Sequence, residues 1–95
     1  MGSKIYLTGG CLVGSYTSMV VAFDPQANTW TQLASMGTSR ADHTSAAIGG
    51  KLYVFGGYSY GERTASVEAY DPACNAWAQL SDLTSARDEC VAVAL

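Results

Sequence analysis

Residues 51–57 read KLYVFGG, a short apolar run that is closed by two glycines. Residues 4–10 carry a near copy, KIYLTGG, so the two copies lie 47 positions apart. At this offset residues 4–48 align with residues 51–95 without a gap, and 16 of the 45 pairs are identical. Chance does not hold one register over such a length. The chain therefore contains two tandem repeats, and a period in the 40s is typical of repeat architectures.

The composition is that of one small domain with few charges. Charged residues make up 14% of the 95 residues, and the net charge is −3. A nucleic-acid partner favours a basic face, so this balance predicts no nucleic-acid partner. No apolar run is long enough to span a membrane, and residues 1–20 lack the pattern of a signal peptide. Residues 1–3 are interpreted as an artificial start ahead of the first repeat.

The three cysteines, Cys11, Cys74 and Cys90, form no recognisable pattern. Their number is odd and no two are at metal-ligand spacing, so they indicate neither a disulfide framework nor a zinc site. Reduced thiols, together with the absence of an Asn-x-Ser/Thr sequon, favour a cytoplasmic protein.

Each repeat contains short runs of β-branched and aromatic residues that glycines or Asp-Pro turns bound, which is the pattern of strands. The predicted strands are 4–8, 19–23, 29–33, 41–48, 51–55, 66–70, 76–80 and 88–95. The strands at 41–48 and 88–95 consist of small residues, and Gly49 and Gly50 link the first of them to residue 51 as a tight hairpin. No helical period occurs anywhere, so the fold class is all-β.

Both copies carry the same set of marks: a double glycine, an aromatic residue before Asp-Pro, a tryptophan, and an arginine before the small-residue strand. These are Gly9, Gly10, Phe23, Trp30 and Arg40 in the first copy, and Gly56, Gly57, Tyr70, Trp77 and Arg87 in the second. The set resembles the kelch repeat. The resemblance implies antiparallel four-stranded blades of a β-propeller, most often six-bladed in the animal adaptor proteins. In that fold the glycines and the two tryptophans are structural.

The resemblance also implies that the small-residue strand is the innermost strand of a blade. Residues 41–87 then supply a complete blade with its connection, and residues 4–40 supply the outer three strands of another. Residues 88–95 are left as an inner strand that would complete a blade of a neighbouring chain. Two blades leave apolar faces exposed, and head-to-tail contacts can close into rings. We therefore predict a homotrimer that forms one six-bladed propeller, with a tetramer as the alternative.

Few residues in the chain suit catalysis. His43 is the single histidine, so no histidine cluster can hold a metal. No helix follows the double glycines to receive a phosphate, and Asp24 and Asp71 repeat with the turns and are interpreted as turn-formers. Some kelch proteins are enzymes, such as copper oxidases, but copper ligation there needs several histidines and tyrosines. The sequence predicts no cofactor, no metal and no enzymatic activity.

Binding residues are predicted on one rim. The segments 11–18 and 58–65 should share a rim with the connections that carry the repeat arginines, and the Asp-Pro turns should lie on the other. Tyrosine and arginine are enriched where binding energy concentrates. The candidate binding residues are Tyr16, Arg40, Tyr58, Tyr60, Arg63 and Arg87. In kelch adaptors of cullin ubiquitin ligases, this rim resembles the face that captures peptide segments. The repeat arginines also have a structural interpretation, in which they bond carbonyls of a neighbouring blade.

Three functions remain open at this point. The first is a fragment of a substrate-adaptor-like kelch propeller that binds proteins or peptides. The second is an engineered or excised two-blade unit whose main property is self-assembly. The third is a fragment of a kelch-type enzyme. The sequence names no ligand and no parent protein.

Overall fold

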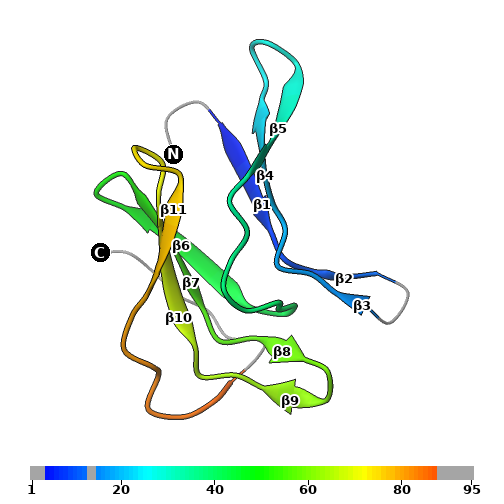
Figure 1. Ribbon diagram of the computed structural model, residues 1–95, viewed down its shortest axis with the longest axis vertical. Helices are drawn as coiled ribbons and strands as arrows, with labels where there is room; N and C mark the ends of the chain where they lie inside the picture. The colour runs from blue at the N-terminus through cyan, green and yellow to red at the C-terminus, as the bar shows by residue number, and fades with distance from the viewer. Residues whose placement is uncertain (1–3, 13–14, 88–95) are drawn as a thin grey trace.

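The computed structural model describes residues 4–12 and 15–87, and within them it consists of strands and turns (Figure 1). These described ranges hold no helix long and apolar enough to cross a membrane. The inner strand predicted at residues 88–95 and the start at residues 1–3 lie outside the described residues. The all-β class predicted from the sequence is confirmed.

The first blade is a three-stranded antiparallel sheet in the order β1-β4-β5. Its strands are β1 (Ile5–Thr8), β4 (Val20–Asp24) and β5 (Thr29–Leu33). Side chains alternate between the two faces of a strand, so Val20 and Ala22 share one face while Phe23 and Trp30 share the other. Val20 and Ala22 are buried and their face meets the second blade. The opposite face, here called the entry face, carries the exposed Ile5, Leu7 and Trp30.

The second blade is a four-stranded antiparallel sheet in the order β11-β10-β7-β6, as predicted for residues 41–80. Its strands are β6 (Thr44–Ile48), β7 (Lys51–Phe55), β10 (Val67–Asp71) and β11 (Ala76–Gln79). Gly49 and Gly50 join β6 to β7 at φ values of 59° and 77°, which suit a tight hairpin turn. The strand predicted at 41–48 begins later, at Thr44, because Ala41 pairs with Tyr58 outside the sheet.

Two small hairpins extend the blades. The first joins β2 (Cys11–Leu12) to β3 (Ser15–Tyr16), and the second joins β8 (Tyr58–Ser59) to β9 (Glu62–Arg63). Neither hairpin is among the strands predicted from the sequence, so that prediction is incomplete here. Strands of two residues are too short to show a periodic pattern, so no strand signal is detectable in these segments.

The Asp-Pro turns confirm the structural interpretation of their aspartates. Asp24 Oδ1 accepts hydrogen bonds from the backbone N–H groups of Gln26 and Ala27, at 3.0 and 3.3 Å. Asp71 Oδ1 accepts from the N–H of Ala73 at 2.9 Å. Such bonds replace backbone partners in a tight turn, so neither aspartate is a candidate for acid–base chemistry.

The core lies between the two blades, at the contact called here the internal joint. Val20, Met36 and Val54 form the buried cluster, and Leu33 and Trp77 pack against it. On the second blade the register places Val54 and Trp77 on the face that meets the first blade. Tyr53 and Ala69 then face the other way, on the surface called here the exit face. Each blade therefore contributes residues to one shared core between them.

Candidate binding rim and internal joint

The two small hairpins define the candidate rim. Figure 1 shows β2–β3 and β8–β9 at one end of the blades, and the turns after β4, β6 and β10 at the opposite end. This arrangement follows from the meander, because successive connections of antiparallel strands leave from alternate ends. The rim predicted to hold the tyrosines is therefore distinct from the rim that holds the Asp-Pro turns.

Three predicted binding residues meet on this rim. The ring of Tyr16, from β3, lies 5.0 Å from the ring of Tyr60 in an edge-to-face arrangement and 5.9 Å from the ring of Tyr58. The Tyr60 hydroxyl also accepts a hydrogen bond from the backbone N–H of Tyr16 at 3.3 Å. Aromatic pairs at these distances attract each other beyond simple burial. The tyrosine cluster, Tyr16, Tyr58 and Tyr60, thus joins the rims of both blades.

Backbone contacts hold the tyrosine cluster in place. Tyr58 exchanges two backbone hydrogen bonds with Ala41, at 2.8 and 3.0 Å. The hydroxyls of Ser39 and Ser59 lie 3.0 Å apart. Tyr60 nevertheless keeps 65% of its surface exposed. Burial, together with the nearby Cys11 and Tyr58, raises the pKa of Tyr16.

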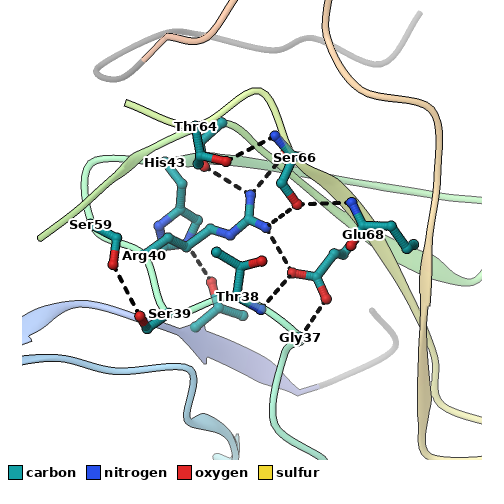
Figure 2. Close-up of polar contacts among 12 residues, drawn as sticks. Gly37, Thr38, Ser39, Arg40, His43, Ser59, Thr64, Ser66 and Glu68 are labelled. Carbon is teal, nitrogen blue, oxygen red and sulfur yellow. Dashed lines mark hydrogen bonds and ion pairs between the residues drawn. The ribbon is translucent and has the colours of Figure 1, made fainter. Parts of the chain in front are cut away.

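Arg63 lies next to the cluster, and Arg40 does not reach the surface. Arg63 is exposed on β9 and directly opposite Tyr58 in the hairpin register. Arg40 has 0% of its surface exposed. The expectation that Arg40 binds a ligand on the rim is therefore wrong. Its side chain crosses the internal joint into the second blade, which is the structural alternative that the sequence left open (Figure 2).

The Arg40 guanidinium is bound by backbone and side-chain oxygens of the second blade. Its Nη1 donates to the carbonyls of Gly56 and Ser66, at 2.8 and 2.9 Å. Its Nη2 donates to Ser66 Oγ at 2.8 Å and to Glu68 Oε2 at 2.7 Å. Burial lowers the pKa of Arg40, and the carboxylate of Glu68 opposes that shift. The joint therefore holds a charged, fully desolvated ion pair.

Glu68 is the residue of this site that sequence reasoning missed. It lies on β10, is only 2% exposed, and accepts hydrogen bonds from the backbone N–H groups of Gly37 and Thr38, at 2.5 and 3.2 Å, besides the bond from Arg40 (Figure 2). A signal was present, because Glu68 interrupts an apolar strand where the first repeat has Val21. A carboxylate inside a strand that is buried on both faces requires a charged partner.

Arg87 repeats the backbone position of Arg40 with a different side-chain environment. The carbonyls of Arg40 and Arg87 each accept from the second glycine of their own blade at 2.7 Å, Gly10 and Gly57 respectively. Their N–H groups donate to Thr17 and Thr64, at 3.2 and 3.3 Å. The Arg87 side chain, however, is exposed, and its Nη2 donates to Ser85 Oγ at 3.0 Å.

These carbonyls explain the first glycine of each doublet. A Cβ atom on Gly9 would lie 2.3 Å from the carbonyl oxygen of Arg40, and one on Gly56 would lie 2.4 Å from that of Arg87. Both glycines also have positive φ, +62° and +63°. Only glycine fits such an approach of two backbones. The double glycine and the arginine, 31 residues apart (40 − 9 and 87 − 56), are thus one structural unit.

The two tryptophans occupy equivalent outer-strand positions, as predicted. Trp77 is half-buried in the internal joint, where its Nε1–H donates to the carbonyl of Ala34 at 2.8 Å. Trp30 is 58% exposed on the entry face and keeps a ring contact with Phe23 at 4.7 Å. Trp77 therefore packs between the described blades, and such packing is not observed for Trp30.

His43 belongs to the joint as well. Its Nε2 lies 2.7 Å from Thr8 Oγ1 on the first blade. Burial, and then the positive charge of Arg40, lowers the pKa of His43. In the part of the chain that the structure describes, no three residues among His, Cys, Asp and Glu come together as a possible metal site.

Known proteins match this arrangement over the whole chain. The family model of the KLHDC2/KLHL20/DRC7 Kelch-repeats domain matches residues 1–95. A solved structure titled "Structure of YjhT" superposes with a TM-score of 0.76 at 32% sequence identity. The match covers 96% of this chain and 28% of the YjhT chain, so the present chain spans less than a third of that neighbour. No curated protein sequence matches it significantly. The chain belongs to the kelch-repeat family, and its two repeats form blades of the β-propeller type.

Proposed function

We propose that the chain is a sector of a non-catalytic, adaptor-like kelch propeller that binds a protein or peptide segment on its hairpin rim. The observation that carries this proposal is the tyrosine cluster of Tyr16, Tyr58 and Tyr60, which two blades build together. Arg63 on the same hairpin adds positive charge to the rim.

Physical chemistry supports a binding role for such a cluster. Tyrosine provides a large contact area and a hydroxyl at the cost of ordering only two side-chain torsions. The bonds between Tyr58 and Ala41 and between Tyr60 and Tyr16 order much of that surface before a ligand arrives. Preorganisation of this kind strengthens binding because less conformational entropy is lost.

The placement of the polar groups also favours binding over catalysis. His43, the single histidine, is engaged with Thr8 inside the joint. A general acid or base must reach the proton that it transfers. The cytoplasmic location predicted from the sequence stays a prediction.

The test is a selection with a phage-displayed library of random linear peptides against the folded chain. We expect the wild-type chain to enrich a peptide motif, and Tyr60→Ala to lose it while its circular dichroism spectrum stays unchanged. Gln26→Ala is the matched control, because Gln26 is exposed on the opposite rim. A motif that survives Tyr60→Ala, or that Gln26→Ala abolishes equally, would refute this assignment of the rim.

A further inference from the structure

The internal joint can be compared with the two blade faces that lie outside it. The repeat offset of 47 positions matches the apolar contacts and the arginine of the joint with positions on the exit face or the entry face. The first blade contributes Val20, Leu33, Met36 and Arg40 to the joint, and the exit side of the second blade presents Val67, Leu80, Leu83 and Arg87 in their places. The exit side thus repeats the apolar set and the arginine.

The backbone of the exit side is also arranged as at the joint. Met36 N–H donates to the carbonyl of Ser18 at 2.9 Å, and its counterpart Leu83 donates to Ala65 at 2.8 Å. The two repeat arginines share both of their backbone hydrogen bonds, as described above. Because the backbone matches, the Arg87 side chain leaves its blade at the position from which Arg40 crosses to the next. The exit face is therefore preformed to receive another blade.

The exit face also has a hollow in which part of that blade would fit. It is lined by Tyr53, Ala69, Ala78 and Leu80, among others. The equivalent surface of the first blade includes Leu33 and Ala34. Leu33 and Trp77 pack against the same buried cluster, and Trp77 donates a hydrogen bond to the carbonyl of Ala34. A tryptophan on the fourth strand of an incoming blade would occupy the same place on the exit face.

The entry face shows what a second copy of this chain would offer to Arg87. The place on the entry face that corresponds to the binding site of Arg40 is an open hollow. It is lined by Gly9, Gly10, Thr17 and Met19. These residues are the counterparts of Gly56, Gly57, Thr64 and Ser66. The N–H of Gly9 donates to the carbonyl of Met19 at 2.9 Å, as Gly56 does to Ser66, so the same two carbonyls are in place. The side chains differ. Met19 replaces the hydroxyl of Ser66, and Val21 replaces the carboxylate of Glu68.

A second copy would therefore surround Arg87 with carbonyls. Its strand β4, the counterpart of β10, would supply no carboxylate. The backbone N–H groups of Thr84 and Ser85, counterparts of Gly37 and Thr38, would also lose the acceptor that Glu68 provides at the joint. A buried charge without its partner is strongly destabilising. We propose that the exit face binds a kelch blade with a carboxylate at the position of Glu68, in preference to a second copy of this chain.

The homotrimer predicted from the sequence stays untested. The proposal makes that assembly less favourable than binding of an acid-bearing blade. The test uses this chain as its own probe. Wild-type chain is immobilised through its N-terminus, and three soluble variants are passed over it. All three carry Arg87→Ala, so that their own exit faces do not compete with the immobilised exit face for an acid-bearing entry face. The acid-bearing probe adds Met19→Ser and Val21→Glu, the neutral control adds Met19→Ser and Val21→Gln, and the third variant keeps Met19 and Val21.

We expect the acid-bearing probe to bind at least about tenfold more tightly than the other two variants, because close charge pairs across interfaces couple strongly. An immobilised Arg87→Ala chain should lose this preference. Equal binding of the third variant would overturn the proposal, because it presents the entry face of a second copy. Binding that does not depend on Arg87, or no binding by a folded acid-bearing probe, would overturn it too.

A second measurement guards against a probe that fails to fold. Val21→Glu and Met19→Ser in the otherwise wild-type chain give each copy both an arginine and its acceptor. Light scattering should then find closed assemblies, of about 30 kDa for three chains (3 × 10.0 kDa), at concentrations where the wild-type chain shows none. A wild-type chain that already forms such an assembly would show that the exit face accepts a second copy, and this would overturn the proposal.

Discussion

Trp30 and Trp77 sit at the same position of two copies of one repeat, yet their surroundings differ. Trp77 is half-buried and hydrogen-bonded to the first blade, whereas Trp30 keeps 58% of its surface exposed. Gly57 and Gly10 also differ, because residues 40–43, which lead into the inner strand of the second blade, pass close to Gly57. A Cβ on Gly57 would lie within 3.3 Å of Ala41, His43 and Arg40, and one on Gly10 would meet nothing within 4 Å. In a repeat protein, the neighbouring blade decides what a repeated residue contributes.

The largest expected effect comes from Glu68 and its counterpart Val21. Glu68→Ala removes the acceptor of three donors and leaves Arg40 buried without a carboxylate, so we expect a loss of about 3–5 kcal/mol in the free energy of unfolding. Val21→Ala on the entry face should cost about 1 kcal/mol or less. Urea denaturation followed by circular dichroism measures both. Similar losses for the two variants would mean that the ion pair does not hold the joint.

The tryptophans give the next largest effect. Trp77→Ala should cost about 3 kcal/mol, near the lower end for a large aromatic residue because the ring is only half-buried. Trp30→Ala should cost about 1 kcal/mol, since the chain loses mainly the ring contact with Phe23. The difference between the two losses, measured by denaturation, reports the packing of the internal joint. Adding a blade that covers the entry face should raise the loss for Trp30→Ala towards that for Trp77→Ala.

The smallest expected effect is the pH dependence of the free energy of unfolding that arises from His43. Its pKa is lowered in the folded chain, so between the folded value and about 6.5, the ordinary value, the unfolded chain binds more protons. This contribution to stability is complete above about pH 6.5 and is lost as pH falls through the folded pKa. The stability of the wild-type chain should thus decline from pH 7.5 to 5.5, a range chosen to lie above the titration of ordinary carboxylates (about 4).

His43→Gln provides the control for this prediction. It keeps a polar side chain near Thr8 and removes the titrating group. Its unfolding free energy should change less over the same range. An equal decline in both proteins would assign the pH dependence to other groups.

The sequence predicted the strands well because their signals are local. Short runs of β-branched and aromatic residues, Asp-Pro turns and the Gly49-Gly50 hairpin each involve residues close together in the chain. The four-stranded second blade follows from them without knowledge of the first. The rim was also predictable, since alternate connections of a meander leave from opposite ends.

The joint was only partly predictable, because its contacts link residues far apart in the chain. The arginine could be found by its repetition, but repetition alone does not say whether its side chain faces solvent or a neighbouring blade. Glu68 does not repeat at all, and a comparison of the two copies therefore passes over it. The small hairpins were not predicted for a different reason, because strands of two residues have no detectable period.

The arginine crossing also sets an order of events during protein synthesis. Arg40 is made 28 residues before Glu68, the acceptor of its charge. At a synthesis rate of about 5–20 residues per second, the first blade waits roughly 1–6 s before the ribosome has added that carboxylate. During this interval Arg40 stays hydrated, and burying it early would carry the full penalty of an unpaired charge. The joint can therefore close only after Glu68 has been made.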